Sequence, residues 1–298
     1  MKKVKFDVTG RRRVFFHASL IMIFGLLLFF PSTVRSEVIL KKVTTQDGGI
    51  KKIYYVMGRE IARDVIKPDG SATRVGVIPD GKVYEYYGNG KLKTVLEFKN
   101  NRLFGTQKSF YENGGLKSVS DCEEGMCTKK IYSENGILTF ELNEKNGKRE
   151  GVNKEYFESG QLKVVYDFKN DKLEGISRHY YENGMLKGEW SYKDGRLEGT
   201  SMVYTEKGQL EGVYHYEKAR LNGVTKIYYE SGELNGEWNY VDGILQGVAM
   251  TYYKNGQIKL EGGYKNGKRE GLFKEYDQYG NVLSSTIYQQ GRPIKEIK

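Results

Sequence analysis

The chain has 298 residues, of which 37 are Gly, 3 are His and 2 are Cys, and its formal net charge is +10. Seven Lys or Arg and one Asp lie in residues 1–36, so residues 37–298 carry only +4. A nucleic-acid-binding protein is expected to keep a dominant or clustered basic excess, so we predict no nucleic-acid partner. Two Cys with no nearby His make too few ligands for a metal site, and we predict neither a metal nor a cofactor.

Residues 1–36 are typical of a secretory signal peptide. A basic start precedes an apolar run over residues 14–30, which is broken only by His17 and Ser19, and a small-residue end follows at Val34–Ser36. We predict cleavage before Glu37 and export to the periplasm or cell surface. The alternative is an inner-membrane anchor through residues 14–30, because a run of 17 apolar residues is at the lower limit for spanning a membrane.

Residues 37–80 predict degenerate capping hairpins. The string EVILKKVTT, the turn QDGG and the string IKKIYYVMG indicate one hairpin, and two Pro-Asp-Gly turns bound further short extended pieces. Terminal units of a repeat array are often atypical because they cover its end.

Residues 81–298 form an array of nine units with a period of 24 residues. We number positions within a unit from its opening residue, taken as position 0. Position 5 is always aromatic and position 9 is always Gly. The opening residues are Gly81, Gly105, Cys127, Gly151, Gly175, Gly199, Gly223, Gly247 and Gly271, and the unit of Cys127 begins two residues early.

Each unit predicts two strands and two turns. Its first half is rich in β-branched and aromatic residues and ends in a Gly-containing turn, and its second half alternates in twos. A three-residue loop, made of a type I turn and a Gly bulge, would set position 5 opposite position 11, whereas a two-residue loop would shift that register by one. We favour the first and expect the position 5 rings in the core. The fold class is therefore all-β, an elongated single-layer antiparallel sheet of tandem 24-residue β-hairpin repeats with about eighteen strands.

The units, such as YYENGMLKGEWSYKDGRLEG, resemble the bacterial variant form of the MORN repeat, which is found in the YwqK family of putative antitoxins. The resemblance covers residues 81 to about 292. It implies a row of hairpins used as a scaffold or binding surface, and it brings no catalytic residue. Lipid binding has been proposed for MORN proteins in general.

Both cysteines lie in the irregular unit that opens at Gly105. Cys122 stands at position 17, which is otherwise aromatic, and Cys127 stands at the opening position of the next unit. The loop Glu-Glu-Gly-Met between them would place the thiols opposite each other, and in an oxidising compartment this predicts a disulfide. A redox pair and a metal site are the alternatives.

Large rings recur next to small residues in the regular part of the array. In three successive units, a Gly at position 13 precedes an aromatic residue at position 15, so that a ring can lie flat across the bare Gly. The rings indicate core-like packing first and a contact surface second, and the two are compatible. The candidate binding strip consists of Tyr180, Trp190, Tyr192, Tyr214, Tyr216, Tyr228, Trp238, Tyr240, Tyr252 and Tyr264.

No catalytic constellation is evident. His179 and His215 occupy different positions of different units, and the Gly-rich strings contain no phosphate-binding loop. We therefore predict a non-enzymatic exported scaffold that binds a partner at the cell envelope. A protein partner is expected first, with a glycan or lipid headgroups as alternatives. The alternative function is an antitoxin or immunity protein that neutralises a cognate toxin.

Overall fold

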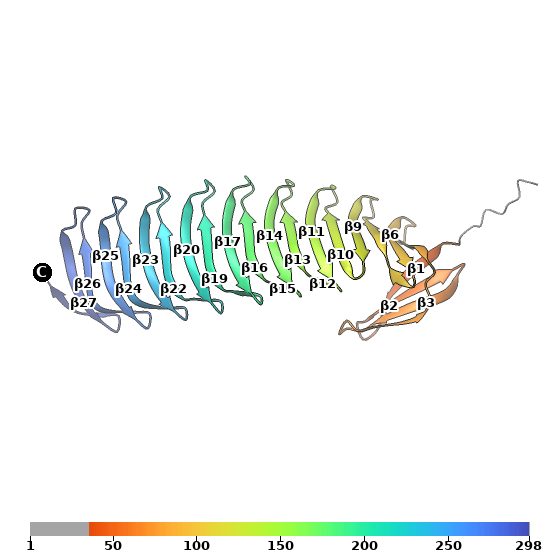
Figure 1. Cartoon of the computed structure of the whole chain (residues 1–298), viewed down its shortest axis with the longest axis horizontal. Coiled ribbons are helices and arrows are strands. Elements are labelled where there is room, and N and C mark those ends of the chain that lie inside the picture. Colours follow the sequence, from red (N-terminus) through yellow and green to blue (C-terminus); the bar gives the residue numbers. More distant parts are fainter. Residues whose placement is uncertain (1–35, 298) are drawn as a thin grey trace, which may run out of the picture.

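The computed structural model describes residues 36–297, which form one open sheet of 28 strands with no helix in that range (Figure 1). The nine units contribute eighteen long antiparallel strands arranged as successive hairpins. The predicted all-β class and the elongated hairpin array are confirmed. The prediction of about eighteen strands matches the long strands of the nine units but not the whole described sheet, which adds four strands before the array and six further ones. Within the described range, no helix is long and apolar enough to span a membrane. The apolar run over residues 14–30 and the predicted signal segment lie outside the described residues, apart from Ser36.

Four strands precede the array, and they are β1 (Val38–Thr44), β2 (Ile50–Val56), β3 (Arg59–Ile66) and β4 (Ala72–Gly76). The paired long strands of the nine units are β5 (Gly81–Tyr86) and β6 (Leu92–Lys99), β8 (Gly105–Phe110) and β9 (Leu116–Glu123), β10 (Met126–Tyr132) and β11 (Leu138–Lys145), β13 (Gly151–Tyr156) and β14 (Leu162–Lys169), β16 (Gly175–Tyr180) and β17 (Leu186–Lys193), β19 (Gly199–Tyr204) and β20 (Leu210–Glu217), β22 (Gly223–Tyr228) and β23 (Leu234–Val241), β24 (Ile244–Tyr252) and β25 (Ile258–Lys265), and β26 (Lys268–Tyr276) and β27 (Val282–Gln289). The remaining strands are β7 (Arg102–Leu103), β12 (Lys148–Arg149), β15 (Lys172–Leu173), β18 (Arg196–Leu197), β21 (Arg220–Leu221) and the terminal β28 (Arg292–Ile297).

The main buried cluster lies at the N-terminal end. Strands β2 and β3 run obliquely to the array (Figure 1), and β1 pairs in parallel with β5 through Val38 and Val83. This arrangement covers the first hairpin with a second layer that the rest of the sheet lacks. The cluster comprises Val38, Leu40, Tyr54, Ala62, Ile78, Val83 and Phe98.

The first turn of each unit is the three-residue loop that the sequence favours. In the unit of Gly223, the Tyr229 amide donates to the Glu233 carbonyl at 2.8 Å, and Gly232 takes the left-handed φ of 98° that ends the loop. Tyr228 consequently pairs with Leu234, which places position 5 opposite position 11 as predicted. The register then shifts between Ile227 and Tyr228, so a β-bulge follows at once.

The second turn is a two-residue loop. Asp194 and Gly195 have φ values of 50° and 80°, as a type I′ turn requires, and they join Lys193 to its cross-strand partner Arg196. Two extra residues then bulge from the returning strand, because Tyr192 pairs with Leu197 but Glu189 pairs with Met202.

Neighbouring units are fastened together by side chains at three fixed positions. The position 6 tyrosine donates its hydroxyl to the position 5 carbonyl of the next unit, as Tyr229 does to Tyr252 at 2.7 Å. The position 5 tyrosine donates back to a glutamate of the preceding unit, as Tyr252 does to Glu237 at 2.8 Å. The acid at position 23 accepts a hydrogen bond from a backbone amide in the second turn of the next unit, as Glu198 does from the Lys218 amide at 2.8 Å. Stability is therefore shared between nearest neighbours.

The position 5 tyrosines make the folding stability of the array sensitive to pH in the alkaline range. Burial and the hydrogen bonds to Glu141 and Glu237 raise the pKa of Tyr156 and of Tyr252 to about 12. Since an unfolded tyrosine titrates near 10, their contribution is complete below about pH 10 and is lost as pH rises from about 10 to 12. Melting temperatures across this window should fall less steeply for the variant Tyr156→Phe/Tyr252→Phe than for the unmodified protein, and equal slopes would contradict the assignment.

Candidate functional site

The array has two chemically different faces. His179 and Trp190 pack edge to face at 4.5 Å between ring centroids, so they share one face. Glu237 precedes Trp238 in β23 and points the other way, and it accepts a hydrogen bond from Tyr252. The face that carries positions 2, 4, 15 and 17 is called the aromatic face, and the other is called the opposite face.

The ten residues of the candidate binding strip do not form one strip. Trp190, Tyr192, Tyr214, Tyr216, Trp238, Tyr240 and Tyr264 lie on the aromatic face, whereas the position 5 residues Tyr180, Tyr228 and Tyr252 lie on the opposite face. The position 5 rings are also only half-buried, and Tyr86 is 39% exposed, so the expectation that they form the core is wrong. The bulge after the first turn is the cause, because one extra residue reverses the face of everything beyond it.

Further rings that the sequence analysis missed belong to the aromatic face, among them Tyr166, Phe168, Phe273 and Tyr288. Tyr166 and Phe168 occupy positions 15 and 17 of the unit of Gly151, opposite Asn153 and Gly151. Both rings stand at the same positions as the strip residues of the other units, so the period of the array could have identified them. Val164 takes the place of the Gly at position 13, and the pattern of Gly followed by a ring is therefore absent from this unit. The set called the aromatic strip is Tyr166, Phe168, Trp190, Tyr192, Tyr214, Tyr216, Trp238, Tyr240 and Tyr264.

In three units the position 15 ring lies against the position 13 glycine of its own strand. A Cβ built on Gly188 would be 2.6 Å from the Cη2 atom of Trp190, and one built on Gly236 would be 2.6 Å from the Cη2 atom of Trp238. Any larger residue at position 13 would therefore displace the ring. The predicted packing of rings across bare glycines is confirmed, and the strip residues with the exception of Phe168 remain half-buried.

Small hydroxyl residues are buried opposite these rings at position 2. Ser177, Ser201 and Thr225 are 2%, 1% and 5% exposed and pair with Trp190, Tyr214 and Trp238. Ser177 donates to the Val165 carbonyl at 3.2 Å. Among the described residues, the hydroxyls of Ser201 and Thr225 have no partner.

Thr225→Val is expected to stabilise the array by about 1 kcal/mol, because Val keeps the shape of Thr and removes an unsatisfied buried hydroxyl. The matched variant Ser177→Ala removes a hydroxyl that is hydrogen-bonded and is expected to cost about 1 kcal/mol. Urea unfolding of both variants checks the pair of values, and a destabilising Thr225→Val would show that its hydroxyl has a partner.

The strip is uncharged over its central three units. Between Gly175 and Gly247, positions 2, 4, 13, 15 and 17 carry no Asp, Glu, Lys or Arg. Burial lowers the pKa of His179, and the positive charge of Lys187 lowers it further, so the imidazole is neutral at pH 7.

The N-terminal end of the strip is hollowed. Arg149 lies over the Phe168 ring at 4.1 Å and pairs with Asp171 at 3.2 Å. These residues, together with Phe140 and Tyr166, line a hollow of about 540 Å³.

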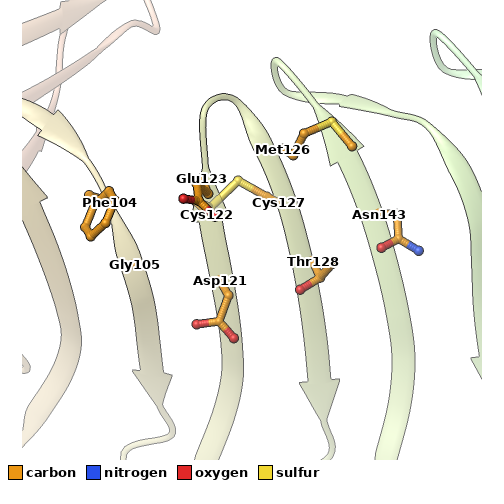
Figure 2. Close-up of a pocket in the computed structure, with 9 residues that line it drawn as sticks. All are labelled: Phe104, Gly105, Asp121, Cys122, Glu123, Met126, Cys127, Thr128 and Asn143. Carbon is orange, nitrogen blue, oxygen red and sulfur yellow. A yellow bond between two sulfur atoms is a disulfide. The ribbon is translucent and has the colours of Figure 1, made fainter.

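The cysteine hairpin lies before the strip in the array. Cys122 and Cys127 form a disulfide between β9 and β10, with their Cα atoms 4.2 Å apart. Figure 2 shows the bridge beneath the turn, with Phe104 on one side and Asn143 on the other, around a hollow of about 360 Å³. Cys127 pairs with Glu144 as an opening Gly pairs with position 17, so its predicted position is confirmed. It also pairs with Cys122 as Leu197 pairs with Tyr192, and the two missing residues are the bulge that other second turns carry.

The two histidines are not brought together. His179 lies on the aromatic face, and His215, which is between Tyr214 and Tyr216, lies on the opposite face. The residues from 36 to 297 contain no cluster of three or more His, Cys, Asp or Glu that could hold a metal ion.

Comparison with known proteins gives one family. The MORN repeat variant model matches residues 79–100, 105–120, 149–170, 173–194, 221–242 and 245–266. No curated protein matches the chain. Among solved structures, a porin-like protein from Bacteroides uniformis aligns over 87% of this chain and 92% of its own at 10% identity, but the TM-score of 0.15 is too low to support a shared fold.

Proposed function

Because the chain belongs to the MORN repeat variant family, a family of non-catalytic repeat scaffolds, we infer that it is an exported scaffold that binds an extended partner along its aromatic strip at the cell envelope. The observation that supports this most is the strip itself. Nine rings lie on one face of a single-layer sheet, and eight of them keep part of their surface open to solvent. Exposed aromatic surface of this extent usually marks a contact site.

The disulfide and the signal-like segment support export. A bridge such as Cys122–Cys127 persists in an oxidising compartment and is rare in the cytosol. The intact mass of the natively expressed protein, measured without reducing agent in each cell fraction, tests this. We expect an envelope or released species that begins at Glu37 and carries the disulfide, whereas a reduced, full-length cytoplasmic species would contradict export.

Binding through the strip is tested by sedimentation with isolated cell envelopes. The variant Trp190→Leu/Trp238→Leu keeps an apolar cover over Gly188 and Gly236 but removes both flat rings, and it should lose about tenfold or more in affinity. The matched control Val224→Ser/Val248→Ser alters residues that are 39% and 58% exposed on the opposite face, and it should bind as the unmodified protein does. Loss of envelope binding in the control variant alone would place the contact on the opposite face. Circular dichroism verifies that both variants fold.

A further inference from the structure

The strip has a spacing that selects among extended partners. Each unit contributes two strands, which lie about 4.8 Å apart, so the same position recurs every ~9.6 Å along the array. The position 15 rings Tyr166, Trp190, Tyr214 and Trp238 follow this spacing through four successive units. A β-1,4-linked glycan is an extended ribbon whose sugars alternate in orientation. It therefore repeats every two sugars, at nearly the same interval as the rings.

The rings are presented as platforms. The six-membered end of the Trp190 and Trp238 indoles lies against the glycine of its own strand, which holds each ring close to the sheet. The apolar faces of pyranose sugars stack on such flat surfaces. Among residues 36–297, the hydroxyls of Tyr192 and Tyr216 have no protein hydrogen-bond partner, so they are available to sugar hydroxyls.

The charge of the strip excludes other occupants. The central three units have no charged side chain at the strip positions, and His179 is neutral there. An anionic lipid surface would call for clustered Lys or Arg, and a lipid interior would call for protruding apolar side chains in place of rings laid flat. A protein partner anchors through side chains that fill pockets, whereas these rings form an even, repeated surface.

We propose that the aromatic strip binds a neutral β-1,4-linked glycan, laid across the strands with one disaccharide for each unit. This rests on the proposed function and names its partner. The chain runs along the array from Trp190 toward Tyr264 and stacks its sugars on the half-buried position 15 and position 17 rings. Phe168 takes no sugar, because it is buried beneath Arg149.

The test uses the fact that both tryptophans of the chain lie in the strip. The purified protein is titrated with β-1,4-linked N-acetylglucosamine oligomers from the disaccharide to the octasaccharide, and tryptophan fluorescence is followed. Affinity should rise with each added disaccharide, because each one reaches a further unit. Maltooligosaccharides, which are α-1,4-linked and curved, are the matched control and should bind at least about tenfold more weakly.

Three outcomes are informative. Length-dependent binding that is lost in Tyr214→Leu, a variant that keeps both tryptophans as reporters, supports the proposal. Equal binding of both glycan types, or no binding of either while the envelope affinity still depends on Trp190 and Trp238, overturns the glycan but leaves the proposed scaffold intact. Envelope binding that does not depend on these tryptophans overturns the proposed function as well.

Discussion

Arg74→Met is expected to destabilise the capped end of the protein by about 3–5 kcal/mol, because it would leave a buried carboxylate without its cation. Asp64 is 8% exposed and accepts from the Arg74 guanidinium at 2.5 and 2.8 Å and from the Tyr54 hydroxyl at 2.9 Å. Burial alone would raise the pKa of Asp64, but the hydrogen bonds from Arg74 and Tyr54 hold it below its usual value. Arg74 also lies 5.6 Å from the centre of the Phe98 ring in the first repeat unit.

The matched control is Arg63→Met in the neighbouring strand. Arg63 pairs with Glu60 through side chains that are 48% and 36% exposed, and such a surface pair is worth about 0–1 kcal/mol. Urea unfolding gives both free energies, and hydrogen exchange of β1–β6 shows where protection is lost. An Arg74→Met effect as small as that of Arg63→Met would show that this network does not hold the cap to the array.

Phe273→Ala is expected to lower the free energy of unfolding by about 3–4 kcal/mol, because it removes a buried ring. The Phe273 ring is 4% exposed and packs edge to face with Tyr264 and Tyr288 at 5.5 and 5.0 Å. It occupies the space above Gly262, where any Cβ would clash with it. This unit reverses the usual arrangement, since Gly stands at position 15 and the ring stands at position 2 of the next unit.

The double variant Phe273→Ala/Gly262→Tyr moves the ring to position 15, where the other units of the strip carry one. Gly262→Tyr alone should destabilise by about 1–3 kcal/mol through overpacking, but the backbone of Gly262 is not left-handed and accepts a side chain. The double variant should therefore be more stable than the sum of the single effects predicts. Leu272→Ala, at an adjacent residue that is 42% exposed on the opposite face, is the control and should cost under about 1 kcal/mol. Additive effects at Gly262 and Phe273 would contradict this packing.

The sequence predicted the strands and turns because the physics that sets them is local. The Gly of the first turn, as at Gly232, and the Asp-Gly pair of the second, as at Asp194 and Gly195, identify their turn types by their spacing. The period of 24 residues then repeats this local information, and the hairpin array follows.

The sequence did not predict which rings share a face. Positions 5, 11, 13, 15 and 17 have the same parity, so counting in twos places Tyr228 beside Trp238. The bulge between Ile227 and Tyr228 inserts one residue and reverses this relationship, and a bulge leaves no reliable mark in the alternation of residue types. The parallel pairing of Val38 with Val83 was also not predictable, because it joins distant segments through tertiary packing.

Two repeated hydrogen-bonding positions are visible in the sequence, but the sequence does not show their partners. The position 6 tyrosines, such as Tyr229, and the position 23 acids, such as Glu198, recur with the period. Their partners lie in the next unit, so their role is evident only once neighbouring units are placed side by side.

Photo-crosslinking in living cells reports directly which face of the sheet touches the envelope partner. A benzophenone amino acid is placed at Tyr214 or Tyr240 on the aromatic face, or at Val224 or Val248 on the opposite face. We expect crosslinked species from positions 214 and 240 and none from positions 224 and 248. Crosslinks from the opposite face alone would contradict this expectation.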